Sequence, residues 1–140
     1  MKKNKLLMIM LILLVAITLV GAVALVVVLK VTGEEKEPTI DEVLKSSVDV
    51  PQITTNLADD ELIRISFKIQ TDSKKSAEEL TKRDFQVKNV IILELSEKKS
   101  EDLQGKEAQL KFEEELKNKI TTLMQEGKVV KVYITEALLQ

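Results

Sequence analysis

The sequence predicts an α+β protein, in which a single N-terminal transmembrane helix precedes a small β-β-α-α-β domain outside the cytoplasm. Three observations predict this class. An uncharged apolar run lies near the N-terminus, alternating apolar and polar residues mark strands, and helical spacing fills the segment between the second strand and the last. The resulting division is 1–5 as a cytoplasmic N-terminus, 6–29 as the transmembrane helix, 30–50 as a stalk and 51–140 as the domain.

The run from Leu6 to Leu29 contains 24 residues without a charge. As a helix that rises about 1.5 Å per residue, it reaches about 36 Å, against a hydrocarbon core of about 30 Å. A buried helix of a soluble protein is one alternative, but the remaining residues are too few to build a core that covers it. We therefore predict a membrane anchor that begins at Leu6 and ends at Leu29.

A cleaved signal peptide is the more serious alternative to a retained anchor. Lys2, Lys3 and Lys5 form a basic start, and Ala22-Val23-Ala24 fits the small-x-small pattern of a cleavage site. The apolar run is longer than the roughly 7 to 15 residues of a typical signal, and it continues past that site to Leu29. The sequence therefore favours retention of the segment.

The charges that flank the anchor predict its orientation. Three lysines precede it, whereas Glu34, Glu35 and Glu37 follow it, and the positive flank tends to stay in the cytoplasm. We expect a single-pass protein of the cytoplasmic membrane with its N-terminus inside and residues 31–140 outside. That outer part carries 17 Lys and Arg against 23 Asp and Glu, a net charge of −6, which disfavours nucleic acid as a partner.

Residues 30–50 are predicted to form a stalk, because Gly33, acidic residues and Pro38 accompany few large apolar side chains. A short helix within it would be capped by Thr39 or Asp41. Two interpretations remain open: a solvated spacer, or a segment that meets a partner just above the membrane surface.

A hairpin is predicted next. Residues 48–55 alternate weakly, and residues 61–70 alternate clearly between apolar and polar positions. The apolar positions of the second strand are Ile63, Ile65, Phe67 and Ile69. Since the connection from Asn56 to Asp60 is short and rich in turn-forming residues, we expect the two strands to pair.

Helical signals follow the hairpin. The first helix starts at Ser73 or Ser76, and Ser76-x-x-Glu79 matches a capping box. Helical spacing then predicts a buried face that consists of Val87, Val90, Ile91 and Leu95, widened by Ile92 and Leu93.

The strongest helical pattern runs from Gly105 to Glu126. Its predicted core side consists of Ala108, Phe112, Leu116, Ile120 and Leu123. Three Glu-to-Lys pairs at i, i+4 are expected on its surface: Glu107 with Lys111, Glu113 with Lys117 and Glu115 with Lys119.

A final strand closes the domain. Gly127 suits a left-handed residue at the end of the preceding helix. Val130, Val132 and Ile134 then alternate with polar or amphipathic residues, which indicates a strand in the same sheet as the hairpin. The helices are expected to cover one face of that sheet.

The composition excludes much chemistry. The chain has 140 residues and contains no cysteine and no histidine, so disulfides, thiolate nucleophiles, histidine relays and zinc sites built from the usual ligands are excluded. The four glycines are too isolated to form a phosphate-binding loop. We predict no enzymatic activity, no cofactor, no metal and no small-molecule substrate.

Several short segments together resemble a known family. They are Asn56-Leu57-Ala58-Asp59, Val90-Ile91-Ile92-Leu93-Glu94-Leu95-Ser96, Glu101-Asp102-Leu103, Gly105-Lys106 and the terminal Val132-Tyr133-Ile134-Thr135 with Gln140 as the last residue. In this order and spacing they resemble the flagellar basal-body-associated protein FliL family, and the single N-terminal span and the stalk agree with it. The resemblance implies a domain similar to stomatin-like (SPFH) scaffold domains. It also implies association with the flagellar stator, self-association into a ring and support of swimming or swarming.

Three functions are weighed at this point. The first is the flagellar motor accessory protein just described, and the second is a generic membrane-anchored scaffold of another cell-envelope assembly. The third is an anchored enzyme that works with two carboxylates, as glycosidases do. Nothing in the sequence singles out such a pair, because Asp59-Asp60-Glu61 and Glu113-Glu114-Glu115 have the character of a turn and a solvated helix face. The residues of the partner interface are not predicted.

Overall fold

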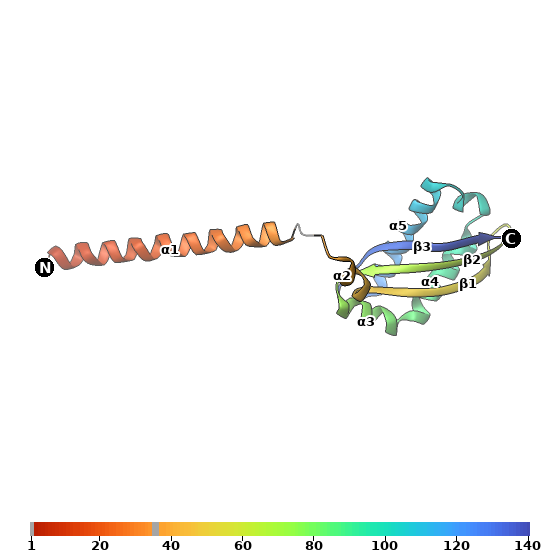
Figure 1. The fold of residues 1–140 in the computed structure, drawn as a ribbon, viewed down its shortest axis with the longest axis horizontal. Coiled ribbons are helices and arrows are strands. Elements are labelled where there is room, and N and C mark those ends of the chain that lie inside the picture. The colour runs from red at the N-terminus through yellow and green to blue at the C-terminus, as the bar shows by residue number, and fades with distance from the viewer. Residues whose placement is uncertain (1, 35–36) are drawn as a thin grey trace. The chain divides into compact units, whose positions relative to one another are not determined.

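The computed structural model describes residues 2–34 and 37–140 and divides the chain into two compact units, residues 1–38 and 39–140 (Figure 1). The first unit is the helix α1, Lys2–Glu34. Its candidate membrane span is Lys3–Leu29, and its apolar side chains are exposed on every face. The helix continues five residues beyond the predicted end of the anchor at Leu29.

The second unit is built on a three-stranded antiparallel sheet in the order β1-β2-β3. Its strands are β1, Ser47–Asn56, β2, Leu62–Thr71, and β3, Val129–Leu139. The predicted hairpin is β1 and β2, and the predicted final strand is β3. Both expectations are confirmed, and β2 lies in the centre because the last strand pairs with it rather than with β1.

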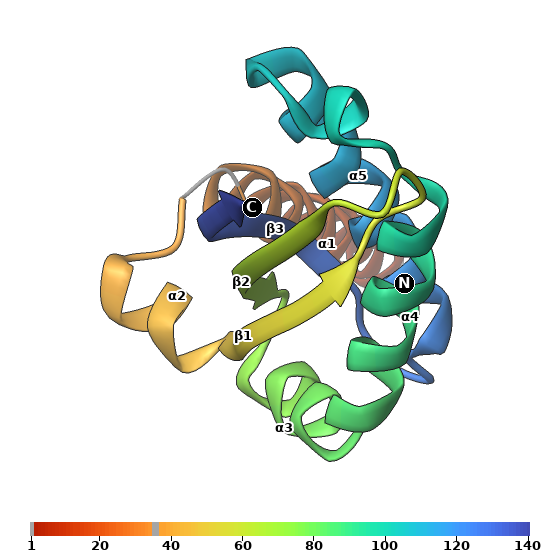
Figure 2. The same cartoon turned by 90° about the vertical axis from the view of Figure 1, so that its right-hand side faces the viewer.

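The helices that follow β2 cover one face of the sheet. They are α3, Lys74–Lys82, α4, Asp84–Glu97, the 3₁₀ helix η1, Ser100–Leu103, and α5, Lys106–Leu123. Figure 2, which looks along the strands, shows α3, α4 and α5 on one side of the sheet and the short helix α2, Ile40–Lys45, on the other. The α+β class with a one-sided helix layer is thus confirmed.

The core lies between the sheet and this helix layer. Alternation in β2 buries every second residue, as predicted, because those side chains face the helices. Phe67 on β2 meets Phe112 on α5 with ring centroids 6.4 Å apart in a tilted arrangement. The other large side chains that are almost fully buried are Ile63, Ile65, Ile69, Leu80, Ile91, Leu95, Leu116, Ile120, Val129 and Val132.

The folded domain begins earlier than predicted. The sequence placed residues 39–50 in the stalk, but α2 and the start of β1 belong to the second compact unit. Thr39 caps α2 by accepting the Glu42 N–H, while the Glu42 carboxylate accepts the Thr39 N–H, which is a complete capping box. The Ser46 carbonyl accepts the Thr71 N–H at 2.8 Å, which fixes the end of α2 to the sheet.

Three details of the helices differ from the prediction. Ser73 caps α3, and Ser76 lies inside that helix with its hydroxyl on Asp72, so the predicted Ser76 capping box is wrong. Leu93 is 57 % exposed, while the neighbouring Glu94 is buried and forms an ion pair with Lys119. Glu94 follows Ile91 by three positions, so helical spacing places it on the buried face. A buried carboxylate needs an oppositely charged partner, and here that partner lies on another helix.

The surface ion pairs of α5 also differ. Glu115 pairs with Lys98 at 2.8 Å, Lys117 pairs with Glu114, and Lys119 pairs with Glu94. Partners from other elements therefore replace the predicted i, i+4 pairs of Glu115 and Lys119. The helix itself ends at Leu123, three residues before the predicted end.

A bulge near the start of β3 changes which residue of that strand is buried. Thr71 pairs with Val129 and Gln70 with Lys131, so Val130 is an extra residue, and Val129 is buried in place of the predicted Val130. Gly127 has φ +79° as predicted, but it lies in the turn before β3 rather than at the end of the helix. A Cβ at this position would come within 2.0 Å of the Ser76 hydroxyl oxygen, so the turn requires glycine.

Candidate interaction surfaces

The exposed apolar surface of α1 is the largest surface of its kind among the described residues. Leu6 and Leu29, the predicted limits of the anchor, are both exposed, and the whole candidate span between them is unburied. A helix that is apolar on all sides is stable when hydrocarbon surrounds it. Within residues 2–34 and 37–140, one helix is long and apolar enough to cross a membrane, and it lies near the N-terminus.

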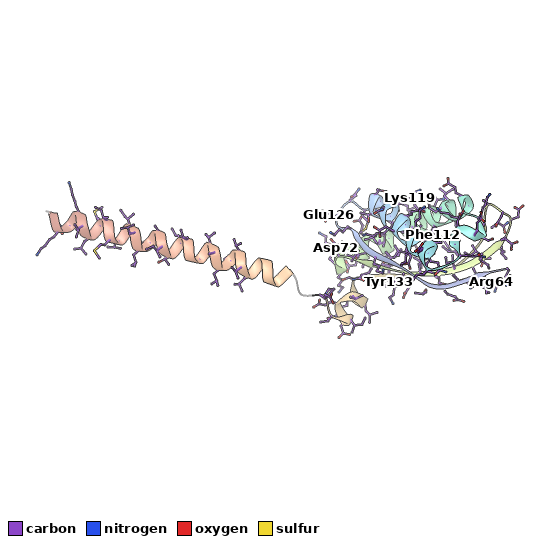
Figure 3. The ribbon with its side chains drawn as sticks, turned by 90° about the horizontal axis from the view of Figure 1, so that it is seen from above. Arg64, Asp72, Phe112, Lys119, Glu126 and Tyr133 are labelled. Carbon is purple, nitrogen blue, oxygen red and sulfur yellow. The ribbon has the colours of Figure 1, made fainter. Side chains whose placement is uncertain are left out.

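A polar hollow of about 480 Å³ lies where α3 meets the turn before β3. Its carboxylates are engaged in hydrogen bonds that hold the turn. Asp72 accepts the Ser76 hydroxyl at 2.6 Å and the Lys128 N–H at 3.3 Å. Glu79 accepts the Gln125 N–H at 2.9 Å and the Glu126 N–H at 3.3 Å, and it also pairs with Arg83 at 2.8 Å. Figure 3 labels Asp72 and Glu126 at this end of the domain.

These hydrogen bonds determine the protonation of both groups. The Ser76 hydroxyl, together with the Lys128 N–H, holds the pKa of Asp72 below its ordinary value of 3.8. The Gln125 N–H, followed by Arg83 and the Glu126 N–H, holds the pKa of Glu79 below 4.5. A glycosidase needs one carboxyl group with a raised pKa as its general acid. Asp72 and Glu79 are therefore better suited to fix the turn than to transfer protons, and within residues 2–34 and 37–140 no group of three or more carboxylates could hold a metal ion.

Replacing Glu79 with glutamine should make folding less sensitive to acid. Because the pKa of Glu79 is lowered in the folded state, its contribution to stability is present above about pH 4.5 and is lost as the pH falls through the folded value. We expect the wild-type protein to lose more stability than Glu79→Gln between pH 7 and pH 3, measured by urea unfolding of residues 39–140.

Glu78→Gln is the matched control, since this neighbouring side chain is exposed and is not among the residues of the described chain that hydrogen-bond to the turn before β3. It should retain the pH dependence of the wild type. Equal pH dependence of all three proteins would show that Glu79 does not hold the turn.

The β1–β2 turn is fixed in a similar way. Asp59 accepts both the N–H and the hydroxyl of Ser100, at 2.9 and 2.7 Å, and the Ala58 N–H donates to the Lys98 carbonyl. The Ser100 N–H and hydroxyl hold the pKa of Asp59 below its ordinary value. With Leu57 buried, the segment Asn56-Leu57-Ala58-Asp59 joins the hairpin to the loop after α4. The residues Asn56-Leu57-Ala58-Asp59, which are part of the family resemblance, therefore have a structural role in holding this turn.

The sheet face opposite the helices is polar. The β2 side chains that point to it are half-buried: Arg64, Ser66, Lys68 and Gln70. Lys68 forms an ion pair with Asp49 at 3.3 Å, and the Lys131 ammonium lies 5.2 Å from the centre of the Tyr133 ring. Figure 3 shows Arg64 and Tyr133 on the side of the sheet opposite Phe112 and Lys119. This face therefore carries both acidic and basic side chains.

The two edges of the sheet differ. At the β3 edge, the Ile134 N–H donates to the Glu113 carboxylate at 2.8 Å, so a side chain of α5 occupies a backbone donor that faces away from β2. At the β1 edge, Pro51 and a bulge interrupt the strand after Val50. Phe85 at the start of α4 is 67 % exposed and lines an apolar groove beside this edge. Helical periodicity did not identify Phe85, because it lies outside the buried stripe of α4, and the sequence assigned Glu113 to a surface pair with Lys117 rather than to the β3 edge.

The described residues thus define a class of protein in which a small α+β domain follows an apolar N-terminal helix that is long enough to cross a membrane. Residues 47–140 match the family described as flagellar basal body-associated protein FliL. The chain is 51 % identical over 106 residues to the flagellar protein FliL of Bacillus subtilis (strain 168), an alignment that covers 76 % of each protein. It is 30 % identical over 93 residues to the flagellar protein FliL of Aquifex aeolicus (strain VF5), covering 64 % of this chain and 58 % of that protein. The chain therefore belongs to the FliL family of flagellar basal-body proteins, which confirms the resemblance found in the sequence.

Proposed function

We propose that this protein is a membrane-anchored accessory component of the flagellar basal body that associates with the stator and supports flagellar rotation. Residues 6–29 span the cytoplasmic membrane with the N-terminus inside, and residues 31–140 lie outside as a stomatin-like domain. The protein acts by binding and self-association into a ring rather than by catalysis. Membership of the FliL family is the observation that carries this proposal.

The short connection between anchor and domain supports this role. Helix α1 ends at Glu34, and the folded unit begins at Thr39. Four residues separate them, so Glu34 and Thr39 are at most about 17 Å apart even when that segment is fully extended. Confinement of this kind keeps the domain close to the bilayer and raises its effective concentration for a membrane-embedded partner.

The carboxylates of the domain support an absence of catalysis. Those in the polar hollow hold the turn before β3, and Asp59 holds the β1–β2 turn. Their pKa values are lowered, so they accept hydrogen bonds as stable anions. The remaining surfaces, an apolar helix, a polar sheet face and an apolar groove, are suited to contacts with lipid and protein.

Deletion of the gene tests the motor role. Cells that lack the protein should swim more slowly in a medium of raised viscosity, or spread less on a swarming plate. The reason is that the stator would lose contacts with this protein and would therefore transmit less torque. Filament number, counted by electron microscopy, should stay unchanged. Normal swimming and swarming of the deletion strain would contradict the motor role and favour a scaffold of another envelope assembly.

A further inference from the structure

An apolar groove of about 230 Å³ lies between β1 and the start of α4. It is lined by the apolar side chains of Val48, Val50, Pro51, Leu80, Phe85 and Val87. Four of these contribute to the core or pack against it, whereas Phe85 is 67 % exposed at the rim. A large aromatic side chain held in water beside an apolar groove is typical of a binding surface.

The backbone beside the groove is available for pairing. The Thr71 N–H donates to the Ser46 carbonyl, and Ser47 pairs with Gln70 in the antiparallel register. Because hydrogen-bonded and non-hydrogen-bonded pairs alternate along such a ladder, Ser47 and Asp49 direct their backbone N–H and C=O groups away from β2. No strand of the described domain lies beyond β1. Ser47 and Asp49 therefore present unpaired backbone donors and acceptors next to an apolar groove.

The other edge of the sheet lacks this combination. There α5 packs against β3, and the Glu113 carboxylate accepts the Ile134 N–H. At the β1 edge, Pro51 contributes a carbonyl but no N–H, so the available stretch is short and ends at the bulge. The β1 edge thus accommodates a short segment rather than a long strand.

The charges at the groove favour a partner segment that carries a basic side chain. The Asp49 side chain is 78 % exposed and lies on the polar face of the sheet, although Lys68 neutralises part of its charge. Asp84 and Lys88 line the groove on the α4 side. A basic side chain next to Asp49 would be favourable, while alternate side chains of the same segment would point into the apolar groove.

We propose that this groove binds an extended segment of a partner protein, which adds a fourth strand at the β1 edge. The segment pairs with the backbone of Ser47 and Asp49, places an apolar side chain against Phe85 and places a basic side chain near Asp49. Backbone pairing supplies affinity, and the groove supplies specificity. This inference goes beyond the motor role and holds whichever protein supplies the segment.

The test uses the full-length chain in lipid nanodiscs and a fluorescent, blocked hexapeptide in which lysine alternates with valine or leucine. Fluorescence anisotropy should show saturable binding. A scrambled peptide of the same composition should bind at least about tenfold more weakly, since it cannot place apolar side chains on one face. Two further peptides carry N-methyl groups at one or the other set of alternate amides. Only the set that faces β1 should weaken binding, by about tenfold.

Matched protein variants locate the site. Phe85→Ser should weaken binding of the alternating peptide about tenfold, whereas Leu93→Ser should leave it unchanged, because Leu93 is exposed on the same helix but does not line the groove. Both side chains are exposed, so thermal unfolding should confirm that both variants remain folded.

Equal binding by the two variants, or the same affinity for both N-methylated peptides, would overturn the proposal. It would also be overturned if the wild type failed to bind the peptide while sedimentation showed a dimer that Phe85→Ser dissociates. In that case the occupant of the groove would be a second copy of this chain.

Discussion

Removal of residues 6–29 is expected to release the protein from the membrane fraction completely and to abolish its support of motility. The described span is long enough to cross the hydrocarbon core, and its apolar side chains are exposed on every face. Without it, the acidic remainder has no apolar surface of comparable size among its described residues to hold it at a bilayer. The variant should appear in the soluble fraction after ultracentrifugation and should fail to restore swimming in the deletion strain.

An exchange of the anchor separates tethering from specific contacts in the bilayer. Residues 6–29 are replaced by an unrelated apolar sequence of the same length, and Lys2, Lys3 and Lys5 are kept to preserve the orientation. This variant should return to the membrane and restore motility, because the anchor is expected to act through its length and hydrophobicity. Persistence of the deletion variant in the membrane fraction would contradict the assignment of Leu6 and Leu29 as the limits of the anchor.

Truncation of Phe112 to alanine is expected to have the largest effect on the stability of the domain. Phe112 is almost fully buried on α5 and meets Phe67 on the central strand, so its loss leaves a cavity between the sheet and the helix layer. Substitutions of this kind cost about 3–5 kcal/mol, and a domain of this size has a total of about 5–15 kcal/mol. We expect urea unfolding of residues 39–140 to show a loss in this range.

Leu110→Ala is the control for this prediction, because Leu110 lies on the same helix and is 46 % exposed. Its substitution should cost less than about 1 kcal/mol. If the two variants lost the same free energy of unfolding, α5 would not be docked on the sheet as described.

The sequence was sufficient to predict those parts of the fold that depend on local pattern. Strict alternation in β2 identified the central strand and its buried face, and helical spacing identified Phe112, Leu116 and Ile120 as core residues. The uninterrupted apolar run identified α1. In each case, the periodicity of the chain matches the periodicity of the element, and neighbouring elements do not alter it.

Features that depend on contacts between distant residues could not be predicted. A bulge in β3 moves burial from Val130 to Val129, and its position follows from pairing with β2. Glu94 is buried because Lys119, 25 residues away, neutralises it. Ser73 rather than Ser76 caps α3, because the hydroxyl of Ser76 is used by Asp72 beside the turn before β3.

The candidate surfaces show the same limit. Glu113 was assigned to a surface ion pair, yet it binds a backbone donor at the β3 edge, which requires α5 to lie beside that strand. Phe85 is exposed and falls outside the periodic stripe, so its significance follows only from the groove that β1 and α4 form around it. Boundaries of the stalk were misplaced because the six residues of α2 carry a weak pattern, although their capping box and their contact with the sheet place them in the domain.

We expect the domain to contact the stator in motile cells, and chemical cross-linking in intact cells measures this contact. The chain contains no cysteine, so a single cysteine introduced at an exposed position of the domain carries a unique photo-cross-linker. Affinity purification of the full-length protein from membranes of motile cells should then recover stator subunits as covalent adducts. The anchor-deleted variant should recover none, because it does not reach the membrane. Recovery of stator adducts at the same low level from both proteins would contradict an association with the stator.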